Sequence, residues 1–164
     1  MSRVFIPPVG WHKRTLISDA YANWLPSLDV DWWVTLNSNR PITLVGVRRQ
    51  FRAWLARIDS QFLGHDWCRR GEERAFAIAV VEHLHTNTHL HALLRMPAPA
   101  RALGRPYQME SMMKHWRKLE PGGQCFEDLI YAKEGVARYM CKELPFSGHL
   151  EECLIISTEF HNDP

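Results

Sequence analysis

The stretch from 75 to 96 constrains the fold more than any other part of this sequence. An apolar run (75–81) is followed by a polar turn (86–88) and then by a segment in which histidine and arginine residues alternate with apolar ones (89–96). This pattern is typical of a β-hairpin, because successive side chains of a strand point to opposite faces of the sheet. We therefore expect two adjacent antiparallel strands here.

His89 and His91 are candidate metal ligands within this hairpin. They share one face of a strand, and two imidazoles at this spacing can bind the same ion, although solvated surface histidines are the alternative. Glu82, just before the turn, shares their face if it lies directly opposite His89. A register shifted by one residue would place His83 opposite His91 and His85 opposite His89 instead. A carboxylate suits a hard cation better than a third imidazole does.

Length and composition are those of one soluble domain. The chain has 164 residues, 46% of them hydrophobic and 23% charged, so we expect a single domain with an N-terminal arm and short helix (1–30), a core (31–144) and an extension (145–164). The net charge of +2 means that any contact with nucleic acid must come from a local patch. The sequence has neither a membrane-spanning run nor a secretory signal, so we expect a cytoplasmic protein without membrane contact.

The order of the predicted elements indicates the fold class. Periodicity and breaker residues predict a strand, a helix, the hairpin, a helix, a strand, a helix and a final edge strand, at 31–37, 47–58, 75–96, 108–119, 125–131, 134–144 and 153–156. A short helix around 16–25 precedes them. The order β-α-β-β-α-β-α predicts an α+β protein with one antiparallel sheet backed by helices, of the ferredoxin-like split β-α-β kind.

The predicted helix 134–144 carries a candidate nucleophile. Val136, Met140 and Leu144 form its packing line, and Tyr139 and Lys142 lie on one shoulder of that line. A half-buried structural ring is the alternative for the tyrosine. Beside a metal-binding hairpin, a phenol could attack phosphorus and an ammonium could favour the anionic phenol or neutralise phosphate charge.

The outer side of the predicted helix 108–119 is basic. Lys114, Arg117 and Lys118 lie opposite its methionine-rich packing stripe. These three cations are candidates for contacts with a nucleic-acid backbone.

Three short motifs resemble those of one enzyme family. The sequence His-Leu-His at 89–91 resembles the His-hydrophobic-His motif of HUH endonucleases of the rolling-circle replication initiator type. Tyr-Met-Cys-Lys at 139–142 resembles the family's Tyr-x-x-Lys motif, and Val-Thr-Leu at 34–36 resembles its first motif. The three occur in the family's order, and the resemblance covers about residues 31–144.

The resemblance implies both a fold and an activity. It implies the HUH endonuclease fold, with Mg²⁺ or Mn²⁺ bound by His89, His91 and an acidic third ligand, for which Glu82 is the candidate. Single-stranded DNA, at an origin or a hairpin, would be nicked by Tyr139, which stays linked to the 5′ phosphate while Lys142 stabilises charge. A rolling-circle initiator would also work with a host helicase and polymerase.

Two other functions are compatible with these residues. A single-tyrosine transposase of the insertion-sequence kind shares the His-x-His pair and the helical tyrosine, but such enzymes do not usually have the lysine three residues later. The other is a non-catalytic metal- or DNA-binding regulator. It would bind Zn²⁺ or Ni²⁺ through the histidines of the hairpin, His83, His85, His89 and His91.

Overall fold

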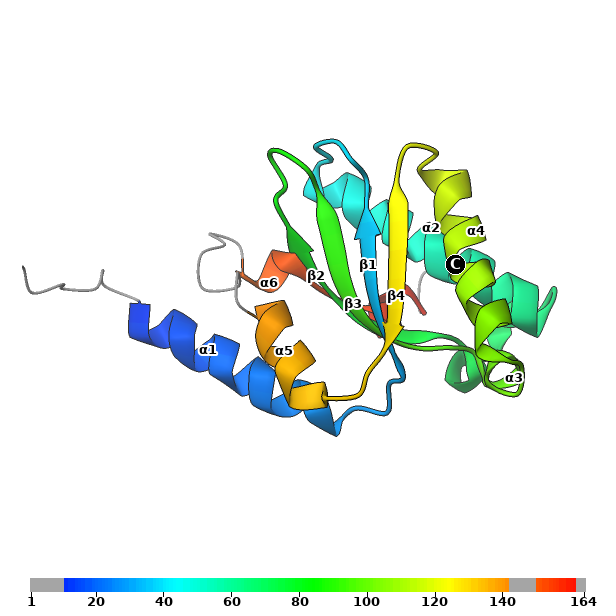
Figure 1. Ribbon diagram of the computed structural model, residues 1–164, viewed down its shortest axis with the longest axis horizontal. Helices are drawn as coiled ribbons and strands as arrows, with labels where there is room; N and C mark the ends of the chain where they lie inside the picture. Colours follow the sequence, from blue (N-terminus) through cyan, green and yellow to red (C-terminus); the bar gives the residue numbers. More distant parts are fainter. Residues whose placement is uncertain (1–10, 142–149, 162–164) are drawn as a thin grey trace, which may run out of the picture.

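A five-stranded antiparallel sheet forms the centre of the protein (Figure 1). A computed structural model of the chain describes residues 11–141 and 150–161. In their order across the sheet, the strands are β4 (Gln124–Leu129), β1 (Trp32–Asn37), β3 (His89–Arg95), β2 (Phe76–Glu82) and β5 (Leu154–Ile156). The helices are α1 (Trp11–Trp24), α2 (Leu44–Leu63), α3 (Ala98–Arg101), α4 (Arg105–Leu119), α5 (Lys133–Cys141) and α6 (Leu150–Cys153).

The succession β1-α2-β2-β3-α4-β4-α5 is the one that the sequence predicted. The predicted α+β class, with an antiparallel sheet and a ferredoxin-like arrangement, is confirmed. The predicted edge strand is also present: β5 pairs antiparallel with β2 and brings the C-terminal part of the chain into the sheet.

Several element ends differ from the prediction. The first helix begins earlier, and β4 ends at Leu129 instead of continuing to 131. The last part of the predicted helix 134–144 lies outside the described residues. Local chemistry explains the bounds of α2, since the Thr43 side chain accepts a hydrogen bond from the Gly46 amide at its start. Gly64 ends the helix with a φ of 78°, which favours glycine.

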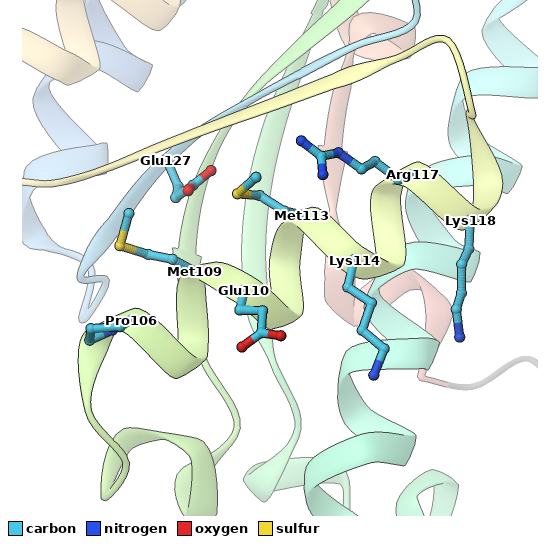
Figure 2. Close-up of a pocket in the computed structure, with 8 residues that line it drawn as sticks. All are labelled: Pro106, Met109, Glu110, Met113, Lys114, Arg117, Lys118 and Glu127. Atoms are coloured by element: carbon cyan, nitrogen blue, oxygen red, sulfur yellow. The ribbon is translucent and has the colours of Figure 1, made fainter.

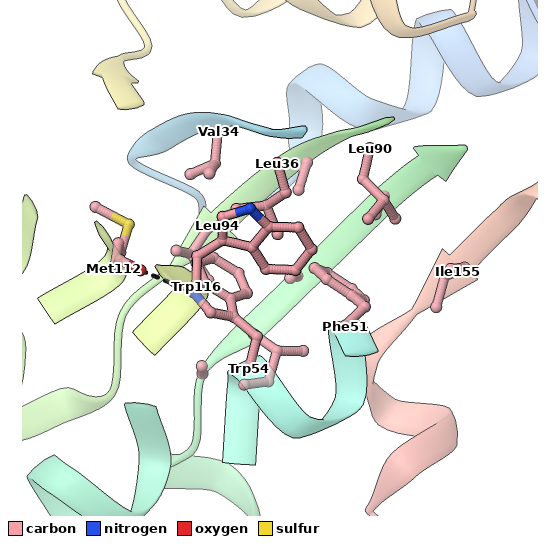
Figure 3. Close-up of a cluster of buried hydrophobic side chains, with 14 of the residues drawn as sticks. Val34, Leu36, Phe51, Trp54, Leu90, Leu94, Met112, Trp116 and Ile155 are labelled. Atoms are coloured by element: carbon pink, nitrogen blue, oxygen red, sulfur yellow. Dashed lines mark hydrogen bonds between the residues drawn. The ribbon is translucent and has the colours of Figure 1, made fainter. Parts of the chain in front are cut away.

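One face of the sheet packs on α2 and α4 (Figures 1 and 3). Val34 and Leu90 project from the strands toward Phe51 and Trp54 of α2. Trp54 also donates a hydrogen bond from Nε1 to the backbone carbonyl of Met112 in α4, at 3.0 Å. Each fully buried side chain of this kind stabilises the fold by roughly 1.5–3 kcal/mol relative to an exposed one, so this face holds most of the core.

The opposite face packs on α1 and α5. Ile78 and Leu93 of the sheet contact the group that includes Ala137 and Met140 of α5. The two helices are joined where the Ser18 hydroxyl donates to the backbone carbonyl of Cys141, at 3.0 Å. Alternation along β2 and β3 places the polar residues of the hairpin on this same face, and α5 lies beside them.

A buried ion pair joins α2 to the start of β2. Asp59 accepts hydrogen bonds from Nε of Arg74, at 2.9 Å, and from the amide of Ala75, at 2.7 Å. Both charged side chains are almost fully buried. Burial raises the pKa of Asp59, although the Ala75 amide and Arg74 oppose the shift.

Within the described residues, no helix has both the length and the apolar composition needed to cross a membrane.

Candidate metal centre and tyrosine

The register of the hairpin brings the predicted ligands together. Glu82 pairs directly with His89, and Val80 pairs with His91, so the three polar side chains project from one face. Oε2 of Glu82 lies 3.3 Å from Nε2 of His89 and 3.5 Å from Nε2 of His91. Glu82 therefore lies directly opposite His89, in the register that the sequence analysis required for a shared face.

The hairpin holds a group of side chains that could bind a metal ion. One ligand atom from each of Glu82, His83 and His89 lies within 4.8 Å of the other two. His83 is the residue directly after β2, and its backbone φ is 54°. His91, which the sequence predicted as a ligand, also approaches the carboxylate. His83, the sequence's alternative to Glu82, therefore lies near the same group as the three predicted ligands.

The tautomer of His89 follows from its neighbour. Nδ1 of His89 lies 3.0 Å from the backbone carbonyl of Asn87, and a carbonyl can only accept, so Nδ1 carries the proton. In the neutral ring Nε2 is then an acceptor, and it lies 3.3 Å from Oε2 of Glu82. Two acceptors at this distance require a cation, or a second proton on the imidazole, between them. The donor set therefore fits a metal ion.

His91 is held in place by two residues of β1. Its Nδ1 lies 2.9 Å from Oγ1 of Thr35. Its ring stacks on the indole of Trp33, with centroids 4.9 Å apart and planes 11° apart. The other nitrogen, Nε2, is buried and has no hydrogen-bond partner among the described residues, and it faces Glu82. A partner that fixes one imidazole nitrogen while the other binds metal is the usual arrangement at metal sites.

Tyr139 lies beside this group. Its ring meets the ring of His91 edge-on at 5.2 Å and that of Trp33 at 5.8 Å. The side chain is 47% exposed, so the ring packs while solvent or a substrate can still reach the residue. A cleft of about 310 Å³ opens here, lined by Trp33, Thr35, His91, Gly135, Val136 and Tyr139.

The other predicted site residues are placed differently. Lys142 lies outside the described residues. Lys114, Arg117 and Lys118 lie on α4, which packs against the opposite face of the sheet from the hairpin histidines. The three cations border a groove of about 750 Å³ between α4 and β4 (Figure 2). They are therefore not part of the same site as Glu82.

The groove between α4 and β4 is mainly apolar, with Met109 and Met113 on its wall (Figure 2). Glu127 of β4 also lines it, and burial raises the pKa of this carboxyl, although a hydrogen bond with Cys125 and the charge of Arg117 oppose the shift. The methionines predicted to be core are thus only partly buried here, whereas Met112 on the same helix is fully buried.

Sequence reasoning did not assign a role to Trp33. Alternation along the strand places Trp33 on the same face as Thr35, which already lay in a motif of interest. The shared face of Trp33 and Thr35 was the feature of the sequence from which a role for Trp33 could have been predicted. The pairing of β1 with β3, which sets Thr35 opposite His91, could not be read from local sequence.

No family model matches the chain, and comparisons with curated proteins and with solved structures give no significant match.

The arrangement combines a metal-binding group with a half-exposed phenol across one short cleft. A divalent cation among carboxylate and imidazole ligands can polarise a phosphate or carbonyl oxygen. A phenol at hand can act as a nucleophile. Together these groups suit transfer of a phosphoryl or acyl group to tyrosine.

Proposed function

We propose that this protein is a metal-dependent endonuclease that nicks single-stranded DNA and transfers the strand through a 5′-phosphotyrosine. The observation that carries the proposal is the contact between Tyr139 and His91, which sets a phenol beside the Glu82 group. The resemblance of the three motifs to rolling-circle initiators supports the same function. Mg²⁺ or Mn²⁺ is the proposed ion, since a carboxylate ligand suits a hard cation.

Each residue at the cleft has a proposed role. Glu82, His89 and His91 hold the ion, which when bound supplies Lewis acidity toward a non-bridging phosphate oxygen. Thr35 fixes the imidazole of His91 through Nδ1. Trp33 packs against both His91 and Tyr139 and so sets the distance between the two.

Tyr139 is the proposed nucleophile. Its phenolic oxygen forms a bond to phosphorus and releases its proton to solvent, while the bond from phosphorus to the 3′ oxygen breaks. The 3′ oxygen takes up a proton and leaves as a free hydroxyl, which can prime synthesis or attack later to reverse the step. Lys142 is proposed to stabilise negative charge near the phosphate.

The test is covalent capture of DNA. Wild-type protein is incubated with labelled single-stranded oligonucleotides of random sequence and Mn²⁺, and denaturing gels are examined for a protein–DNA adduct. We expect an adduct that requires the metal and is absent from Tyr139→Phe. Tyr107 and Tyr131 are also exposed phenols, so Tyr107→Phe and Tyr131→Phe are the matched controls and should retain the adduct.

An adduct that disappears in Tyr131→Phe but persists in Tyr139→Phe would show that another phenol is the nucleophile. Wild-type protein that forms no adduct with any metal or oligonucleotide would contradict the endonuclease function altogether. The rolling-circle and transposase versions share this chemistry. They differ in whether the free 3′ hydroxyl primes synthesis, with a host helicase and polymerase, or is joined to a second site.

A second candidate function rests on His83. Because His83 lies with Glu82 and His89 at ligand distance, the hairpin also suits a Zn²⁺- or Ni²⁺-binding regulator without catalysis. Tight Zn²⁺ binding that depends on His83, together with no adduct in Mn²⁺, would favour this candidate.

A further inference from the structure

The edge strand β4 presents an exposed aromatic ring on the face that carries the metal-binding group. Phe126 pairs directly with Thr35 of β1, and Thr35 pairs with His91 of β3. These three side chains therefore form one row across the sheet and point the same way. Phe126 is 56% exposed, whereas its strand neighbours Cys125 and Glu127, on the other face, are partly buried.

A single exposed apolar side chain is common and needs no special explanation. The position of Phe126 is what distinguishes it. Adjacent strands lie about 4.8 Å apart, so Phe126 stands roughly 10 Å from His91 along the row. Among the described residues no ring contact involves Phe126, in contrast to Trp33 at the cleft, which stacks on His91.

Two amide side chains lie in the next row. Gln124 of β4 pairs with Asn37 of β1, which in turn pairs with His89. Gln124 is exposed, as Phe126 is. The surface beside the metal-binding group thus offers an aromatic face and a hydrogen-bonding amide in these two rows. The row on the other side of Phe126 holds the exposed carboxylate of Asp128, opposite Trp33, so the ring and the amide are the groups on β4 that suit a nucleotide.

We propose that Phe126 stacks against an unpaired base of a DNA strand whose phosphate lies at the Glu82 group. The inference rests on the proposed function and names how that site holds its substrate. Every base has a π-face, and stacking on aromatic residues is a major source of affinity for single strands. A protein segment fits this surface less well, because a flat ring beside a phosphate-binding centre suits a nucleotide better than a peptide.

The experiment separates base contacts from phosphate contacts. Affinity is measured for an oligothymidine and for an abasic oligonucleotide with the same number of phosphates, using the Tyr139→Phe protein so that no adduct accumulates. Replacing Phe126 with Ala in this protein should weaken oligothymidine binding roughly 5- to 150-fold, the usual range for one stacked base. Abasic binding should not change.

Two further variants serve as controls. Phe126→Trp keeps a flat ring and should retain the preference for oligothymidine. Tyr107→Ala removes a ring of similar exposure, 49%, from α4 on the other side of the sheet, and it should have no effect on the preference. Urea unfolding of each variant confirms that the comparison is between folded proteins.

Equal losses for the two oligonucleotides, or no loss for either, would overturn the stacking role of Phe126. If adduct formation by the wild type is retained in that case, the proposed endonuclease function stands and only this inference fails. Failure of the wild type to bind any single strand or form any adduct would overturn both.

Discussion

Oε2 of Glu82 lies 3.3 Å from Nε2 of His89, directly across the β2–β3 pair. The carboxylate is almost fully buried, and a buried charge is stable only when it is paired or binds a cation. Nδ1 of His89 donates to the carbonyl of Asn87, so in the neutral ring Nε2, the nitrogen nearer Glu82, is an acceptor. The pair is therefore arranged to share a cation.

Replacement of Glu82 by Gln should weaken Mn²⁺ binding on the order of tenfold or more, because an amide oxygen is a much weaker ligand than a carboxylate. Calorimetry measures the change directly. A second measurement is the stabilisation by metal: at 100 times its dissociation constant, Mn²⁺ should raise the unfolding free energy of the wild type by about 2.7 kcal/mol. At the same Mn²⁺ concentration, the variant should gain much less.

Glu110→Gln is the matched control, since Glu110 is exposed on α4, which packs on the opposite side of the sheet from the hairpin histidines. It should bind Mn²⁺ as the wild type does. Unchanged Mn²⁺ affinity in Glu82→Gln would remove Glu82 from the ligand set.

Local sequence predicted the hairpin well, for a physical reason. Alternation alone fixes which side chains of a strand share a face, so His89 and His91 could be paired without any structure. The partner across the turn depends on register, which a one-residue change in the turn would alter. Glu82 and His83 therefore remained alternatives until the pairing of Glu82 with His89 was observed.

Contacts between distant segments could not be predicted in the same way. Helical periodicity correctly placed Lys114 on the outer side of its helix, but it does not tell which face of the sheet that helix covers. Trp33 and Thr35 support His91 through the pairing of β1 with β3, whose register is set by the tertiary structure. The exposure of Phe126 likewise follows from the absence of a covering helix among the described residues, and no sequence pattern shows that.

The three cations of α4 offer a test of whether DNA also contacts the second side of the sheet. A triple Ala variant of Lys114, Arg117 and Lys118 should bind all single strands more weakly. Its salt dependence should flatten by roughly 0.7 in the log–log slope for each phosphate contact that is lost. Affinities measured over a series of NaCl concentrations give this slope. An unchanged slope would assign the three residues to ordinary solvated surface.

Arg74→Ala should be strongly destabilising, by about 3–5 kcal/mol, because it leaves the buried carboxylate of Asp59 without its partner. Urea unfolding measures the loss. Replacing both residues by apolar ones, as in Asp59→Leu with Arg74→Met, should cost less than the single change. A double variant less stable than Arg74→Ala would contradict this account.

The same pair predicts a pH dependence. Burial raises the pKa of Asp59 above its unfolded value of 3.8, so the native state binds the proton more tightly than the unfolded state does. Stability then falls as pH rises through the interval between the two values. Removing Arg74 should raise the native pKa further. The loss in Arg74→Ala should therefore be smaller at about pH 4.5 than at about pH 7.5.

His115 should make the protein sensitive to acid. Burial, together with the positive charges of Lys118, Lys114 and Arg57, lowers the pKa of His115 to about 4. The unfolded state therefore binds more protons between about pH 6.5 and 4, and stability falls as pH drops through that interval. His115→Gln should flatten the profile measured by urea unfolding. His65→Gln, at an exposed histidine, should not change it.

The last prediction decides between His83 and His91 as the remaining imidazole ligand. The buried ring of His91 is fixed by Thr35 and Trp33, with Nε2 turned toward Glu82, so little conformational entropy is lost when it binds a metal. His83 has a ligand atom within 4.8 Å of those of Glu82 and His89, but it lies in the turn, where its backbone is in the left-handed region. An imidazole already fixed in its binding orientation makes the better ligand, so His91→Ala should lower Mn²⁺ affinity on the order of tenfold to a hundredfold, and His83→Ala by much less.

Manganese titrations of both variants, followed by electron paramagnetic resonance, measure the two affinities. The reverse order would place the ion among Glu82, His83 and His89, farther from Tyr139, and would favour the metal-binding regulator over the endonuclease.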